Sequence, residues 1–128
     1  MKKILAEISL GELADKITNL EIKIKKIIDK ESLHIMKKEY QSLNAIDLKD
    51  LDLDKYKKLF NELKSINERL WDIENEKRLL EKNSDFNDKF IKVSRDVHFM
   101  NDKRAKVKKE INRSFGSNIE EVKEYTKY

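Results

Sequence analysis

Three residue types are missing or scarce in this chain of 128 residues. It contains no cysteine and no proline, and its only glycines are Gly11 and Gly116. Without cysteine there is no disulfide, no thiolate nucleophile and no zinc site built on sulfur. A β-sandwich or barrel needs frequent turn residues, which this composition does not supply, so long helices are favoured instead.

Long apolar runs are also absent. No stretch is long enough to span a bilayer, and the first ten residues lack the apolar core and small-residue cleavage site of a signal peptide. The hydrophobic content of 38% recurs at regular spacing despite a charged content of 42%, which argues against disorder. We expect a single helical domain over residues 1–128, located in the cytoplasm.

The segment from Ser9 to Ile28 has the clearest helical pattern. Ser9 and Glu12 have the spacing of a capping box, in which each side chain satisfies a free backbone N–H at the start of a helix. Apolar residues then follow at alternating spacings of three and four, which is the pattern of a helix packed along one face. Ile22 falls on a second strip, with Asp15 and Thr18. We therefore predict a central helix that is covered on two sides.

The same periodicity extends along the rest of the chain and predicts an all-α fold. Its expected form is an antiparallel helical bundle with a short extended N-terminal arm and a C-terminal helix. Ser117 and Glu120 have the spacing of a capping box at the start of that C-terminal helix. The bundle is built on a long helical hairpin, about 54–82 and 85–115, packed with a shorter hairpin, about 10–28 and 33–46.

Polar residues interrupt the apolar pattern of the long hairpin, most clearly at Arg104. A guanidinium in an apolar layer needs a carboxylate, and the facing helix offers none at that level. We therefore predict that Glu21 or Asp15 pairs with Arg104 or Arg95. The candidate polar cluster or ligand-binding site comprises Asp15, Lys16, Glu21, Arg95, Asn101, Asp102 and Arg104. Two interpretations stay open: a buried ion-pair network that sets helix register, and a pocket for a small anionic ligand or phosphorylated partner.

Other chemistry is sparse. A candidate basic patch comprises Lys103, Lys106, Lys108, Lys109 and Arg113, and it fits either nucleic acid or one solvated helix face. His34 and His98 have no partner at the spacing of a metal site or catalytic triad, and no glycine-rich phosphate loop exists. We expect no catalytic residue, no metal and no cofactor.

Many polar positions resemble a short all-helical domain-of-unknown-function family of bacteria and marine phages. Its opening signature, SxGELxDKxTxLExK, matches Ser9, Gly11, Glu12, Leu13, Asp15, Lys16, Thr18, Leu20, Glu21 and Lys23. Further matches are Leu70, Trp71, Ile73, Glu74, Phe90, Ile91, Arg95, Val97, Asn101, Asp102, Arg104, Ala105, Ile111, Asn112, Gly116, Ser117, Lys123, Tyr125 and Tyr128. Asn19 departs from the pattern, which has an aliphatic residue there. The resemblance implies a small helical protein and supplies no activity.

Three functions fit the sequence. The first is a non-enzymatic protein–protein interaction or assembly module, a homodimer that uses the long hairpin and the N-terminal arm. The alternative is a small anionic ligand or phosphate-binding protein, and possibly an enzyme, that uses the acid–arginine cluster. The third is a nucleic-acid-binding accessory protein that uses the basic patch. None of the three involves a membrane.

Overall fold

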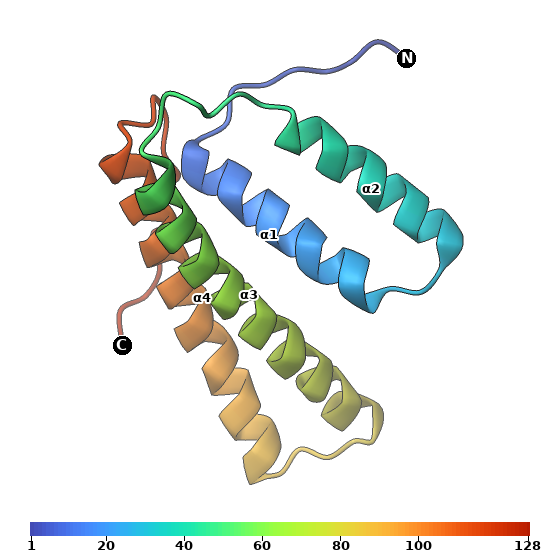
Figure 1. The fold of residues 1–128 in the computed structure, drawn as a ribbon. Coiled ribbons are helices and arrows are strands. Elements are labelled where there is room, and N and C mark those ends of the chain that lie inside the picture. Colours follow the sequence, from blue (N-terminus) through green and yellow to red (C-terminus); the bar gives the residue numbers. More distant parts are fainter.

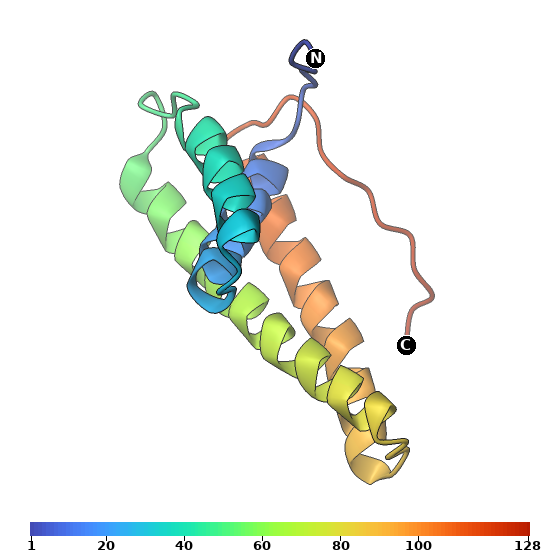
Figure 2. The same cartoon turned by 90° about the vertical axis from the view of Figure 1, so that its right-hand side faces the viewer.

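The computed structural model describes all residues 1–128 and confirms the all-α bundle. Its four helices are α1 (Leu10–Lys26), α2 (Lys30–Asn44), α3 (Leu53–Lys82) and α4 (Asp88–Ser114). Helices α3 and α4 form a long antiparallel hairpin, and α1 and α2 form a shorter one against part of it (Figure 1). In both views the end of the long hairpin that carries the α3–α4 turn extends beyond the shorter hairpin (Figures 1 and 2).

Helix α1 is the central element, as its sequence pattern predicts. It packs against all three other helices, whereas α2 packs only against α1. Leu13, Ile17 and Leu20 are buried along its main apolar strip, and Thr18 and Ile22 are buried on the second strip. Ile22 is only 3% exposed, so the second strip is covered as expected. The polar side chains on this strip are therefore carried into the interior.

The main hydrophobic core lies between α3 and α4, where α1 covers their groove. Its eight buried residues are Ala14, Leu59, Leu63, Ile66, Leu70, Ile73, Val107 and Ile111. Ala14 is the only one from α1, and its small side chain is completely buried. A small residue at this point lets the α1 backbone come close to the hairpin.

The helix starts follow ordinary capping chemistry. The Ser9 hydroxyl accepts the backbone N–H of Glu12, as the sequence predicts. Helix α2 starts three residues earlier than predicted, because Asp29 rather than a later residue caps it and accepts the backbone N–H of Ser32. Hydrogen bonds from Ser32 lower the pKa of the Asp29 carboxyl, and the Ser32 hydroxyl contributes most.

The predicted C-terminal helix is wrong, because the chain after Ser114 forms no further helix. Gly116 has a positive φ of 63°, and the Ser117 N–H donates to the Asn112 carbonyl, which closes α4. The Ser117 hydroxyl accepts the backbone N–H of Leu10 at the start of α1. Ser117 therefore joins the start of α1 to the end of α4 and does not cap a helix of its own. We call residues 117–128 the C-terminal tail; it runs back along α4 (Figure 2).

Candidate functional site

The first turn of α1 touches the last turns of α4 almost backbone to backbone. The Gly11 N–H donates to the Asn112 Oδ1 at 2.6 Å. A Cβ atom at Gly11 would lie 2.5 Å from the Lys108 carbonyl oxygen, closer than real Cβ contacts come. Only glycine fits here without a shift of one helix. This close approach positions the acidic side chains of α1 over Lys108.

Lys108 is the buried centre of an ionic network between α1, α4 and the C-terminal tail. Its Nζ lies 2.8 Å from Glu12, 3.4 Å from Asp15 and 3.3 Å from Glu121. The Lys108 side chain is only 9% exposed. Burial alone would lower the pKa of Lys108, but the Glu12 hydrogen bond and the Asp15 and Glu12 charges outweigh it and raise that pKa. Lys108 is therefore charged and holds three carboxylates together.

Asp15 connects this network to α3. Its Oδ1 accepts a hydrogen bond from the Asn67 Nδ2 at 2.9 Å, and the same amide donates to the Thr18 hydroxyl at 2.9 Å. The Thr18 hydroxyl in turn donates to the Asp15 carbonyl. A layer of buried polar contacts thus joins α1, α3 and α4, and it fixes how α1 lies in the groove between α3 and α4.

The predicted pairing of α1 carboxylates with arginine is wrong. Asp15 pairs with Lys108, and Glu21 pairs with Lys64 at 2.7 Å and accepts the Tyr40 hydroxyl at 2.9 Å. Neither Arg95 nor Arg104 forms an ion pair. The reason is the path of α1: its polar contacts go to α4 at residues 11–15 and to α3 at residues 15–21. At the level of Arg104, one turn from Lys108, α1 no longer supplies α4 with a carboxylate.

The structure divides the predicted polar cluster into separate locations. Asp15 is buried and Glu21 is half-buried, each in contacts between α1 and its neighbours, whereas Lys16 is exposed, 3.8 Å from Glu12. Arg95 lies over the Phe99 ring, 5.6 Å from its centroid, on an exposed side of α4. Asn101, Asp102 and Arg104 come together, and they line one pocket.

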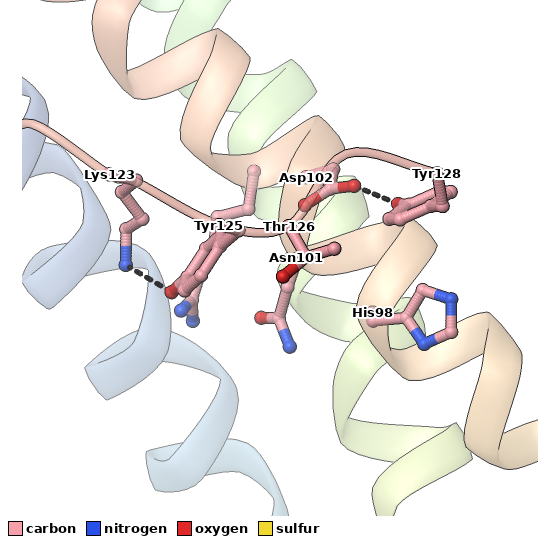
Figure 3. A pocket seen from close by; sticks show the side chains of 8 residues that line it. His98, Asn101, Asp102, Lys123, Tyr125, Thr126 and Tyr128 are labelled. Atoms are coloured by element: carbon pink, nitrogen blue, oxygen red, sulfur yellow. Dashed lines mark hydrogen bonds between the residues drawn. The ribbon is translucent and has the colours of Figure 1, made fainter.

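This pocket lies between α4 and the C-terminal tail and has a volume of about 480 Å³ (Figure 3). The lining residues are His98, Asn101, Asp102, Arg104, Lys123, Tyr125, Thr126 and Tyr128. The Tyr128 hydroxyl donates to the Asp102 carboxylate, and its ring packs edge-on against His98 at 5.1 Å. That hydrogen bond raises the pKa of Tyr128. These contacts hold the end of the tail on α4.

Some charged side chains around the pocket have a partner within the protein, and one does not. Asp102 is occupied by Tyr128, and Lys123 pairs with Glu121 at 2.9 Å, which raises the pKa of Lys123. The half-buried Arg104 has no carboxylate partner. The pocket therefore offers a guanidinium, an amide and two aromatic rings. Such a lining can hold a ligand through charge, hydrogen bonds and ring contacts.

Five of these lining residues were not assigned to a site from the sequence: His98, Lys123, Tyr125, Thr126 and Tyr128. His98 has no partner at a functional spacing in the sequence, and Tyr125 falls within the predicted C-terminal helix, which the structure does not contain. Lys123, Tyr125 and Tyr128 all belong to the matches of the family resemblance. That resemblance was the signal that pointed to them, since periodicity gives no information on an irregular tail.

The candidate basic patch is not a continuous charged surface. Lys108 is buried, and Arg113 lies 3.8 Å from Glu120. Lys103, Lys106 and Lys109 remain exposed. Because Lys108 and Arg113 already face acidic groups, the excess of positive charge at this surface is smaller than the sequence suggests.

Two further observations concern metal ions and membranes. No group of three or more histidine, cysteine or acidic side chains is arranged to hold a metal ion. None of the four helices combines the length and the apolar character that crossing a membrane requires.

Comparison with known proteins places the chain in a family but finds no relative whose role is known. Neither a curated protein nor a solved structure matches the chain. The model of a family of unknown function, DUF6165, matches residues 3–128, which is nearly the whole chain and includes α1, α4 and the tail. The chain belongs to this family of unknown function, DUF6165.

Proposed function

We propose that the protein binds a small anionic ligand in the pocket between α4 and the C-terminal tail. The observation that carries this proposal is the half-buried residue Arg104, which lines the pocket and whose guanidinium has no carboxylate partner. A partly desolvated guanidinium without a counter-charge is unfavourable. A carboxylate or phosphate on a ligand would supply that counter-charge with two parallel hydrogen bonds.

The rest of the pocket narrows the class of ligand. Its volume of about 480 Å³ fits a small organic molecule. The Tyr125 and Tyr128 side chains offer aromatic surface, and the Asn101 amide offers a hydrogen-bond donor and an acceptor. A ligand with one anionic group and one planar ring therefore suits the pocket best.

Calorimetric titration with phenyl phosphate and with inorganic phosphate tests this proposal. We expect phenyl phosphate to bind the full-length protein more tightly than phosphate does, and we expect Arg104→Gln to reduce its affinity about 10-fold or more. Arg95→Gln is the matched control, since Arg95 lies outside the pocket, and it should bind as the unmodified protein does. Equal affinity in both variants, or no binding of phenyl phosphate at millimolar concentration, would overturn the proposal.

A second candidate function is self-assembly through the long hairpin, which was the first expectation from the sequence. It is favoured by three large apolar side chains near the α3–α4 turn, Leu79, Phe86 and Ile91, which are 58%, 59% and 54% exposed. No third helix packs on this end of the hairpin (Figure 1). Light scattering should show a dimer that Ile91→Lys dissociates, whereas a monomer at millimolar concentration would remove this candidate.

A further inference from the structure

A second pocket lies at the opposite side of α1 from Lys108. It has a volume of about 330 Å³ and is enclosed by α1, the end of α2, the loop between α2 and α3, and the start of α3. Its walls are mostly apolar, with Ile17 from α1, Leu43 from α2, Ile46 and Leu48 from the loop, and Phe60 from α3. None of these residues lines the pocket that holds Arg104.

Three exposed polar side chains, Asn44, Asp54 and Lys57, also line this pocket. Two half-buried ones, Tyr56 and Glu21, distinguish it from a simple packing defect. Tyr56 lines it, and the Tyr56 hydroxyl is buried without any hydrogen-bond partner. Glu21 lines it too, but the Glu21 carboxylate already accepts hydrogen bonds from Tyr40 and Lys64. A buried hydroxyl without a partner is costly, and native structures usually satisfy such a group. The Tyr56 hydroxyl therefore has an unused hydrogen-bonding capacity, and it belongs to a residue that lines this pocket.

The Tyr56 hydroxyl is protonated at neutral pH, as in an ordinary tyrosine, and its surroundings favour that state further. Burial, with a contribution from the nearby Glu21 charge, raises the pKa of Tyr56 to about 12. The hydroxyl is therefore available as a donor. The Glu21 carboxylate is already neutralised by Lys64 at 2.7 Å. The lining also contains one further acidic and one basic side chain, Asp54 and Lys57, so it has no excess charge that would select a charged ligand.

We infer that this pocket binds a small, uncharged and mainly apolar molecule that carries one hydrogen-bond acceptor for the Tyr56 hydroxyl. The apolar walls supply most of the affinity, and the hydroxyl selects for the acceptor. Such a ligand differs in chemical class from the anion proposed for the pocket at Arg104. The two sites are therefore independent, and each can be tested without the other.

Acetophenone and ethylbenzene are suitable probes, because they have nearly the same size and differ in one carbonyl oxygen. Titrations followed by amide chemical shifts should show both probes at residues 43–48 and 53–60, with acetophenone bound about 5- to 10-fold more tightly. In Tyr56→Phe the affinity for acetophenone should fall to that for ethylbenzene. The ethylbenzene affinity should not change, since the substitution removes only the hydroxyl.

Two further variants test whether the probes bind in this pocket and independently of Arg104. Ile46→Glu, at a position that is 45% exposed, introduces a charge at the pocket wall and should abolish binding of both probes while the fold is kept. Arg104→Gln should bind both probes normally, so a failure of the anion site leaves this result intact. The inference is overturned if neither probe binds, if ethylbenzene binds as tightly as acetophenone, or if Tyr56→Phe retains the preference.

Discussion

At the scale of single residues, Gly11 determines how closely α1 approaches α4. Gly11 leaves no room for a Cβ atom next to the Lys108 carbonyl, and its backbone N–H donates a hydrogen bond to the Asn112 side chain. The close approach in turn lets Glu12 and Asp15 reach the Lys108 ammonium. One missing Cβ atom and one buried lysine thus define the junction on which the arrangement of the helices depends.

Gly11→Ala should destabilise the protein, although alanine is the better helix former by about 1 kcal/mol. The added Cβ would lie 2.5 Å from backbone, which cannot move like a side-chain end. We expect a net loss of about 2 kcal/mol in the free energy of unfolding, measured with urea. Gly116→Ala is the comparison, because nothing lies within 4 Å there and only its positive φ costs about 1 kcal/mol. A more stable Gly11→Ala variant would contradict the close contact.

Lys108→Met should cost about 2–3 kcal/mol of stability at neutral pH, because it leaves Asp15 and Glu12 without their buried counter-charge. Lys109→Met, at the exposed neighbouring position, should change stability by less than about 0.5 kcal/mol. Urea unfolding of both variants checks this pair. Equal effects would mean that the buried network contributes little.

The same network predicts a dependence on pH at the alkaline end. The folded-state pKa of Lys108 is raised above its ordinary value of 10.5. A raised lysine pKa stabilises the fold fully below the unfolded pKa, and this contribution is lost as the pH rises through the folded pKa. The stability difference between the unmodified protein and Lys108→Met should therefore be constant up to about pH 10 and narrow above it. A difference that stays constant to pH 12 would argue against the ion pairs.

At the scale of helices, the periodicity within each segment predicted the helix bounds. It did not predict which side chains of different helices come into contact. The bounds of α3 and α4 fall within a few residues of the prediction, because the spacing of Leu59, Leu63 and Leu70 is a local property of the sequence. The partner of Asp15 depends on the path of α1 across α4, which no local pattern encodes. The prediction that Ser117 starts a helix was wrong for the same reason: its hydroxyl accepts a hydrogen bond from the distant Leu10 N–H.

Deletion of residues 119–128 tests the correction at the C-terminus. Because the tail contains no helix, the number of helical residues measured by circular dichroism should be unchanged, and helicity per residue should rise. The deletion also removes Tyr125 and Tyr128, so phenyl phosphate binding should be lost. A fall in the number of helical residues by about a turn or more would show that the tail is helical in solution.

At the scale of the whole molecule, stability should differ along the long hairpin. The start of α3 and the end of α4 are covered by α1. Near the turn that connects them, α3 and α4 pack only against each other (Figures 1 and 2). Hydrogen exchange should therefore be faster for amides at 76–82 and 88–92 than for those at 59–67 and 104–111. Equal protection along the hairpin would indicate that a partner covers the uncovered end, which is the assembly candidate.

The proposed function requires that the pocket between α4 and the C-terminal tail receive an anion at Arg104. An NMR titration of the ¹⁵N-labelled full-length protein with phenyl phosphate locates the bound anion residue by residue. We expect saturable shift changes confined to amides at 98–104 and 123–128, together with the side-chain resonance of Arg104. Shifts that instead follow the exposed lysines outside this range, Lys106 and Lys109, and that disappear with added salt, would contradict the proposed site.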